Sequence, residues 1–208
     1  MVYYFTLASD PSVTCYMGRD KFENEELIAH GWPEDIWFHV DQHSSAHVYV
    51  RMPKGKGMDD LTPAVIEECS QLTKANSIEG CKLNNVRVVY TPWSNLRKTN
   101  GMEVGQVGFH NESLRRYHTV ERKNNAMLNK LEKTKITKDG VDFRALREER
   151  DAEERQEIRR KQAEQRQTEK EALEARRKEE ELKSYSSLMV EGKMRSNQDY
   201  VPDDDDFM

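Results

Sequence analysis

The stretch Asp35-Ile36-Trp37-Phe38-His39-Val40, followed a few residues later by Ala46 to Met52, decides the fold of this chain. In both stretches apolar side chains recur at every second position, which is the period of a β-strand with two different faces. One face carries Ile36, Phe38, Val40, Val48, Val50 and Met52. The alternation predicts two strands of one sheet that bury this face in a hydrophobic core.

The other face of the same two strands carries Trp37, His39, His47, Tyr49 and Arg51. Aromatic rings, imidazoles and a guanidinium are suited to stacking on bases and contacting phosphates. Alternatively, a helix or loop covers this face, so that Trp37 and Tyr49 are ordinary packing residues. The sequence leaves both interpretations open. His39 and His47 have no carboxylate or thiolate at ligand spacing, so neither a metal nor a cofactor is expected.

The rest of the first 120 residues mixes strands with one or two helices. A short helix capped by Asn24 ends before Gly31, and a second helix runs from Pro63 to about Ile78, where Gly80 ends it. Additional strands are expected over residues 2–7, 15–18, 86–91, 106–110 and 116–120. The order predicts an α+β fold, a compact mixed domain with a mainly antiparallel sheet and one or two packed helices.

Residues 144–183 contain thirteen Lys or Arg and thirteen Asp or Glu, with no Gly and no Pro. Their large aliphatic residues are too widely spaced for a coiled-coil seam. Opposite charges recur four residues apart in Asp151 with Arg155, Glu157 with Lys161, Glu174 with Lys178, and Glu179 with Lys183. The stretch therefore predicts a long charged single helix. A coiled coil induced by a partner and a disordered segment are the alternatives.

The composition divides the chain into three parts. Residues 1–120 form the α+β domain, and residues 121–183 form a helical arm with a hinge at Gly140. Residues 184–208 are polar and contain the run Asp203 to Asp206, which predicts an acidic disordered tail. This tail is either a solubilising end or a short docking peptide.

The formal net charge of -5 hides an asymmetry along the chain. Residues 1–80 contain six basic and thirteen acidic residues, whereas residues 81–143 contain twelve basic and six acidic residues. If the basic residues of the second part fold onto one surface, they form a phosphate-contacting patch; otherwise they are scattered solubilising charge. The candidates are Arg87, Arg97, Lys98, Arg115, Arg116, Arg122, Lys123, Lys130, Lys133 and Lys135.

Several classes of protein find no support in the sequence. Cys15, Cys69 and Cys81 lack CxxC spacing and indicate neither a disulfide framework nor a zinc knuckle. No run approaches 18 consecutive apolar residues, and the first residues lack the basic region of a signal peptide. We therefore expect a cytoplasmic protein, with the nucleus as a second compartment, and no insertion into membranes.

Short motifs occur in a characteristic order along the chain: Gly18-Arg19, Asn24 with Leu27, Asp35 to His39, His47-Val48, Val88 to Thr91, Arg97-Lys98 and Val104 to Val107. In this combination they resemble the NFACT-R domain family. The whole chain is similar to members of that family in which the domain stands alone and is followed by a charged helix.

The resemblance implies a nucleic-acid-associated module related to the one in ribosome quality-control factors. It implies that Arg97 and Lys98 contact phosphates, and that the signature positions are Arg19, Trp37, His39, His47, Tyr90 and Thr91. Larger relatives often have Pro-Gly-Ser before the second signature histidine. This chain has Ser44-Ser45-Ala46 there, which changes how closely the backbone can approach a ligand.

These observations lead to the hypothesis of a non-enzymatic nucleic-acid-binding adaptor. It would bind RNA in preference to DNA, and its helical arm would contact the ribosome in translation quality control. The candidate nucleic-acid-binding residues are Arg19, Trp37, His39, His47, Tyr49, Arg51, Tyr90, Thr91, Arg97 and Lys98.

Three alternative functions remain open at this point. The first is a hydrolase that uses His39 and His47 as acid and base. The second is a DNA-binding or DNA-sensing protein that acts at a membrane surface. The third is a protein-interaction scaffold that binds no nucleic acid.

Overall fold

The computed structural model describes residues 1–184 and separates the chain into one unit over Met1–Arg150 and a second that begins at Asp151. The first unit is built around a seven-stranded sheet with the order β8-β5-β3-β4-β2-β1-β9, in which every neighbouring pair is antiparallel. The strands are β1 (Val2–Thr6), β2 (Thr14–Gly18), β3 (Asp35–Val40), β4 (Val48–Arg51), β5 (Val86–Pro92), β8 (Arg116–Val120) and β9 (Ile136–Lys138). The predicted α+β class is confirmed.

The remaining elements lie on the two faces and at the ends of this sheet. The helices are α1 (Lys21–His30), α2 (Pro63–Ala75), α3 (Asn125–Lys133) and α4 (Phe143–Lys183). A separate two-stranded sheet pairs β6 (Leu96–Arg97) with β7 (Gly108–Phe109). Short 3-10 turns cover Met58–Asp60, Trp93–Asn95 and Glu112–Leu114. In residues 1–184 we find no helix with the length and apolar character needed to cross a membrane.

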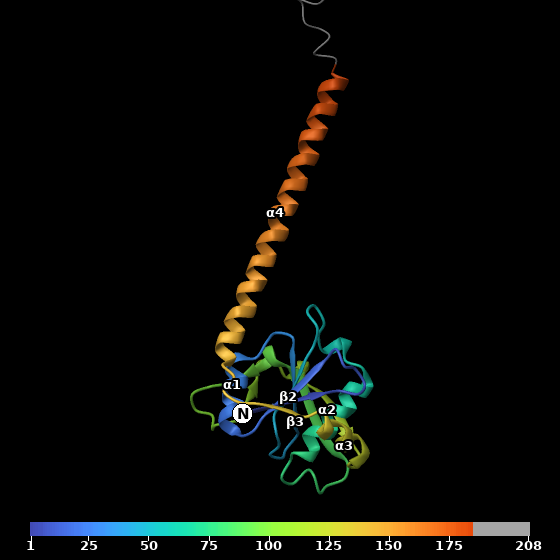
Figure 1. Cartoon of the computed structure of the whole chain (residues 1–208), viewed down its shortest axis with the longest axis vertical. Coiled ribbons are helices and arrows are strands. Elements are labelled where there is room, and N and C mark those ends of the chain that lie inside the picture. The colour runs from blue at the N-terminus through green and yellow to red at the C-terminus, as the bar shows by residue number, and fades with distance from the viewer. Residues whose placement is uncertain (185–208) are drawn as a thin grey trace, which may run out of the picture. The chain divides into compact units, whose positions relative to one another are not determined.

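The first face of the sheet forms the main hydrophobic core. The side chains that the alternation assigned to this face, among them Ile36, Phe38 and Val50, are buried there. Helix α2 supplies Val65, Cys69 and Leu72, and α3 adds Leu131. The two helices pack side by side (Figure 1). This layer is the one that the hydrophobic period of the sequence predicts.

The second face of the sheet is also covered. Trp37 and Tyr49 are 2% and 0% exposed, and they pack in a second cluster with Leu27 of α1. The segment between β5 and β8 adds half-buried Trp93 and Phe109 to this cluster. Of the two interpretations of this face, the covered one is therefore what the structure shows.

Two helix boundaries differ from the predictions. Helix α1 is capped by Asp20 and not by Asn24, because the Asp20 carboxylate accepts hydrogen bonds from the amides of Phe22 (3.0 Å) and Glu23 (3.1 Å). Helix α2 ends at Ala75, and the next carbonyl, that of Asn76, accepts a hydrogen bond from the Ala46 amide (3.1 Å). Pairing with this loop takes the chain out of the helix before Ile78, which is 75% exposed.

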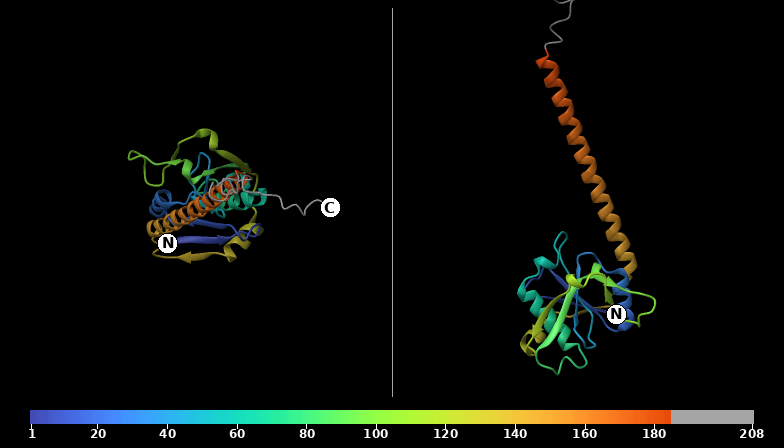
Figure 2. Two further views of the ribbon diagram at one scale, coloured as in Figure 1. Left: turned by 90° about the horizontal axis from the view of Figure 1, so that it is seen from above. Right: turned by 180° about the vertical axis from the view of Figure 1, so that it is seen from behind.

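The compact first unit extends beyond the expected boundary at residue 120. Strand β9, which the sequence did not reveal, pairs with β1 at the edge of the sheet (Figure 2). Gly140, the expected hinge, has a φ of 64°, and it precedes α4, whose first turn is capped by a hydrogen bond from the Ala145 amide to Asp142 Oδ1 (2.9 Å). The first turns of α4 also contact the body, because Arg150 forms an ion pair with Glu34.

From Asp151 onward the described part of the second unit is helix up to Lys183. Two of the predicted pairs are present, Glu157 with Lys161 (2.8 Å) and Glu179 with Lys183 (2.6 Å). Such pairs contribute roughly 0.2 to 0.5 kcal/mol each in an isolated helix. The long charged helix is confirmed. The predicted acidic tail lies outside the described residues, except for Ser184.

A buried ion pair joins β3, β4 and β2 on the second face. The Asp35 carboxylate, which is fully buried, accepts from Arg51 Nε (2.8 Å) and Nη2 (2.9 Å), the Tyr16 hydroxyl (2.6 Å) and the Trp32 amide (2.7 Å). The Arg51 guanidinium also lies 3.7 Å from the centre of the Trp32 ring. Arg51, a predicted nucleic-acid contact, is thus occupied within the fold.

Replacing Arg51 with methionine should strongly destabilise the protein, because it leaves the Asp35 charge buried without its cation. We expect the free energy of unfolding in urea to fall by about 3 to 5 kcal/mol. Arg144→Met removes an exposed ion pair with Glu148 (2.9 Å) and should change the stability little. Equal effects of the two substitutions would show that the buried pair has no special role.

His47 adds a titratable group to the same buried layer. It is 4% exposed, and its ring lies edge-on to that of Trp37 (centroids 5.3 Å apart) and that of His39 (5.1 Å). Burial lowers the pKa of His47 from 6.5 to about 3, and repulsion from His39 and Lys98 adds to this effect. His47 is therefore neutral in the folded protein, whereas it takes up a proton below about pH 6.5 in the unfolded chain.

This difference predicts a loss of stability in acid. Because the pKa of His47 is lower in the folded state, its contribution is fully present above pH 6.5 and is lost as the pH falls toward 3. The free energy of unfolding should therefore change by up to about 1.4 kcal/mol per pH unit because of this residue. Unfolding measured from pH 8 to pH 4 should show a shallower dependence for His47→Gln. The difference in the free energy of unfolding between the two proteins at pH 8 measures the cost of altered packing separately. Identical slopes of stability against pH in the wild type and the variant would contradict the prediction.

Candidate nucleic-acid interface

The signature aromatic and imidazole side chains form one packed cluster. The Trp37 ring stacks on His39 (5.3 Å between centroids, 6° between planes) and meets Phe109 edge-on at 5.8 Å. His47 lies beside both Trp37 and His39. Of these side chains, His39 and Phe109 are half-buried, whereas Trp37 and His47 have almost no exposed surface. Trp37 therefore offers no open face on which a base could stack.

His39 is held by its own strand. Its Nδ1 lies 2.7 Å from the Val40 carbonyl oxygen, so Nδ1 carries a proton and donates it. Burial lowers the pKa of His39, although the carbonyl and Asp41 oppose the shift. His39 and His47 are both neutral near pH 7 and supply no positive charge to a phosphate. Their role in the structure is packing, which removes the main support for the acid and base pair of the hydrolase interpretation.

Tyr90 and Thr91 also lie inside the domain. The Tyr90 ring stacks on Phe38 at 5.2 Å in the first-face core. Thr91 donates a hydrogen bond to the Leu114 carbonyl (3.2 Å) and accepts one from Asn95 (2.9 Å). Thr91 thereby fixes the segment that covers the second face. Like Tyr49 and Arg51, these residues maintain the fold and do not form a surface for a ligand.

Lys98 holds the loop that covers His47. Its ammonium group contacts the Glu25 carboxylate (2.7 Å) and donates to the carbonyls of Glu103 (2.6 Å) and Gln106 (2.9 Å). Burial by itself would raise the pKa of Glu25, but hydrogen bonds from Lys98 and the Gly105 amide outweigh it and lower the pKa. Lys98 is therefore a clamp between α1 and the loop of residues 98–106, with few donors left for phosphate.

Among the cations of the candidate nucleic-acid-binding residues, Arg19 and Arg97 remain accessible. The Arg19 side chain is 57% exposed, and its nearest carboxylate, Asp20, is 3.8 Å away. Arg97 is exposed on β6 and has no ion pair within residues 1–184. Lys21, which the sequence analysis did not select, is also exposed, and it lies next to Gly105, where an added Cβ would come within 3.5 Å of the Lys21 Cβ.

Arg19 and Lys21 border a pocket with a mixed polar and apolar lining at one end of the sheet. Its walls come from the end of β2, the start of α1, the loop before β4 and the end of α2, and they include Gly18, Asp20, Asn24, Ser44, Ser45 and Asn76. Asn24 is 7% exposed, and its Oδ1 has no hydrogen-bond partner within the described residues. This oxygen lies against Gly18, where a Cβ would meet it at 2.4 Å. We call this cavity the Arg19 pocket.

The other basic residues of the predicted patch, all within residues 87–135, do not gather on one surface. Arg87 and Arg115 flank the Tyr117 ring, with guanidinium carbons 4.5 and 5.9 Å from its centre. Lys130 and Lys133 are on α3, which covers the first face of the sheet. The predicted patch is therefore divided among several surfaces.

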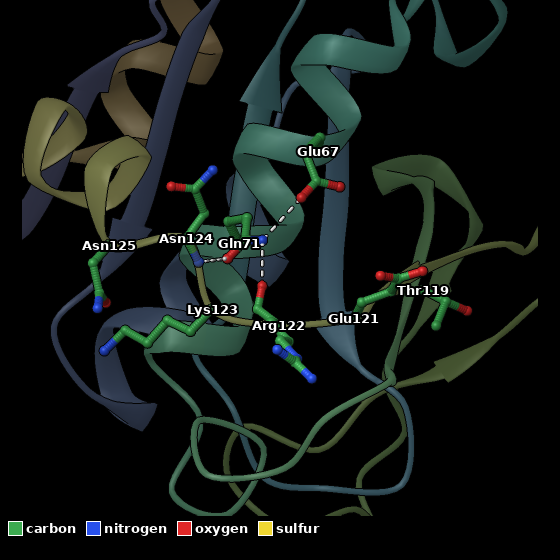
Figure 3. Close-up of a pocket in the computed structure, with 8 residues that line it drawn as sticks. All are labelled: Glu67, Gln71, Thr119, Glu121, Arg122, Lys123, Asn124 and Asn125. Atoms are coloured by element: carbon green, nitrogen blue, oxygen red, sulfur yellow. Dashed lines mark hydrogen bonds between the residues drawn. The ribbon is translucent and has the colours of Figure 1, made fainter.

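Arg122 and Lys123 line a groove between α2 and the segment that follows β8 (Figure 3). Gln71 organises it by donating to the Arg122 carbonyl (2.9 Å) and accepting from the Asn124 amide (2.9 Å). Glu67 and Glu121 share the groove, so its charge is mixed. Two carboxylates balance the two cations of this groove, whereas the Arg19 pocket has two cations and the single carboxylate of Asp20, which makes the Arg19 pocket the better candidate.

The missed residues have identifiable signals in the sequence. The predicted start at Asn24 leaves Lys21 outside the helix, although Asp20 is a good N-cap residue and places Lys21 at the first helical position. Tyr117 is at an outward position of the correctly predicted strand of residues 116–120. Its neighbour Arg115 is only two residues away in the sequence, whereas Arg87 comes from β5, and only the pairing of β5 with β8 brings Arg87 to the ring.

Comparison with known proteins agrees with this architecture. The family model described as the NFACT protein RNA binding domain matches residues 1–111. The solved C-terminal part of the fibronectin/fibrinogen-binding protein from Streptococcus suis has a TM-score of 0.51 and 21% identity. That match covers 64% of this chain and 49% of the other, and it supports the fold alone.

Similar proteins extend over the entire chain. Coiled-coil domain-containing protein 25 of Bos taurus is 54% identical over 210 residues, covering 100% of both chains. Its homolog in Dictyostelium discoideum is 50% identical over 208 residues, again with full coverage of both. Protein JLP2 of Saccharomyces cerevisiae is 41% identical over 144 residues, covering 65% of this chain and 68% of its own. The chain therefore belongs to the NFACT-R domain family represented by coiled-coil domain-containing protein 25.

Proposed function

We propose that this protein is a non-enzymatic adaptor that binds RNA at the Arg19 pocket. The observation that carries the proposal is the combination of two accessible cations, Arg19 and Lys21, with the unpartnered amide oxygen of Asn24. Cations at the rim contact backbone phosphates, and a buried acceptor inside takes a hydrogen bond from a ribose hydroxyl or a base amino group. The RNA-binding family model supports RNA as the ligand.

The buried cluster gives this pocket a rigid support. His47 immediately precedes β4, and β4 pairs with β2. Strand β2 in turn ends at Gly18, which lines the pocket. Lys98 and Glu25 hold the neighbouring loop against α1, which carries Asn24. Signature positions that touch no ligand thus fix the backbone on which the ligand contacts are mounted.

We further propose that the RNA belongs to the translation machinery. The resemblance to the module of ribosome quality-control factors supports ribosomal or transfer RNA as the ligand and the cytoplasm as the compartment. The charged helix from Asp151 to Lys183 is proposed to contact the ribosome. Its balanced ion pairs keep it helical without a buried face, which suits an arm that reaches a second site on a large assembly.

Substituting both rim cations should weaken RNA binding through the electrostatic term. For Arg19→Gln with Lys21→Gln, we expect weaker binding of a labelled single-stranded RNA in fluorescence anisotropy. The slope of log K against log salt should become shallower by about 0.7 for each phosphate that the variant no longer neutralises. The matched control, Lys130→Gln with Lys133→Gln, removes two exposed lysines of α3 and should bind as the wild type does. An equal weakening in both variants would show that only net charge matters.

Ultraviolet crosslinking of the full chain in cell extract addresses the identity of the RNA. The crosslinked peptides should contain Arg19 to Lys21, and peptides with Arg97 should appear where the strand continues across β6. Sequencing of the attached fragments is expected to return ribosomal or transfer RNA. Crosslinks to DNA alone would support the DNA-binding alternative, and a signal no higher than that of the unirradiated control would favour the protein scaffold.

A further inference from the structure

We infer that a second pocket, on the other side of the loop between β3 and β4, binds an unpaired RNA base. This inference rests on the proposed function and deepens it, because it specifies single-stranded RNA as the ligand class. Gln42 and His43 of the loop line this second pocket, whereas the next residues, Ser44 and Ser45, line the Arg19 pocket. One strand of RNA can therefore reach both sites across a few residues of loop.

The second pocket is rich in groups that can read the edge of a base. Its walls include Asp41, Gln42, His43, Asn84, Asn85 and Arg87. The side chains of Gln42, Asn84 and Asn85 form no hydrogen bond with any residue from 1 to 184. Each amide presents a donor and an acceptor, the combination that pairs with the Watson–Crick and Hoogsteen edges of splayed bases. We call this cavity the amide pocket.

One wall of the amide pocket offers a flat surface for stacking. Arg87 donates through Nε to Asp41 Oδ2 (2.8 Å), which fixes the guanidinium plane. The guanidinium carbon lies 4.5 Å from the centre of the Tyr117 ring, and Tyr117 is 41% exposed. Bases stack both on arginine planes and on aromatic rings, so the pair extends the stacking surface from the pocket onto β8.

The backbone of the amide pocket is held in an uncommon conformation. Gln42 has a φ of 67° and Asn85 a φ of 54°, and within residues 1–184 no other non-glycine residue has a positive φ. Both line the amide pocket. The turns are fixed by hydrogen bonds from the Asp41 amide to the Arg87 carbonyl (2.8 Å) and from the Asn85 amide to the Glu121 carbonyl (2.8 Å). Glutamine in this region is unfavourable, and such residues concentrate at binding sites.

The positive φ values allow a test that separates binding from folding. Gln42→Gly with Asn85→Gly removes both amides but places glycine where the backbone favours it, so the thermal midpoint should be unchanged or higher. For the full chain, we expect this variant to bind a labelled 12-nucleotide single-stranded RNA about 5- to 50-fold more weakly. Binding of the same sequence as a blunt duplex should not change, nor should the salt slope, since no charge is removed.

Tyr117→Leu is the second variant and tests stacking. It keeps an apolar side chain at an exposed position and should weaken single-strand binding by about 5- to 150-fold while sparing the duplex. If both variants bind the single strand as the wild type does, the amide pocket is not a base site, although the proposed function stands. If the wild type binds neither RNA, both fail. Both proposals would be supported by two results together. Arg19→Gln should bind the single strand and the duplex more weakly, and the two amide-pocket variants should bind only the single strand more weakly.

Discussion

The buried carboxylate of Asp35 is the constraint on which the second layer of this domain depends. A sheet that is covered on one face can keep its polar side chains in water on the other. This sheet is covered on both faces, so its polar side chains must find hydrogen-bond partners within the protein. Asp35 accepts four hydrogen bonds, from both nitrogens of the Arg51 fork, from Tyr16 and from the Trp32 amide. These bonds connect β3 with β4, β2 and the turn after α1. They fix the C-terminal end of α1 against the sheet, whereas the Arg19 pocket lies at the N-terminal end of the same helix.

The same layer places most signature residues inside the protein, where they have little or no exposed surface. Trp37, His47 and Tyr49 form a packed platform, and Lys98 closes it by fastening a loop to α1. The proposed ligand contacts lie at the margins of the platform, where loops and strand ends expose cations and amides. This division follows a general rule, since binding residues gather on loops that a rigid scaffold positions.

The loop between β3 and β4 is the element at which the two pockets meet. Its hydroxyl residues face the Arg19 pocket, its amide and imidazole residues face the amide pocket, and hydrogen bonds to the end of α2 hold it in place. Backbone contacts at one pocket would give affinity, and base contacts at the other would select unpaired strands. The charged helix from Asp151 onward belongs to a separate unit. It has no apolar face, so any contact that it makes with a large partner would be polar.

The sequence by itself determined most strands of the main sheet, the α+β class and the charged helix, because the period of two in β3 and β4 and the i, i+4 charges of α4 are local patterns. The resemblance placed Arg19 and Arg97 among ten candidate contacts, and the structure shows that the side chains of these two are exposed. Only the tertiary structure decided that the second face is covered, because alternation looks the same whether an aromatic face meets a base or another layer of protein. The pairing of β9 with β1, the clamp made by Lys98 with Glu25, and the approach of Arg87 to Tyr117 each join distant segments. No local pattern encodes such contacts, since they arise when the sheet brings together side chains that the chain keeps apart.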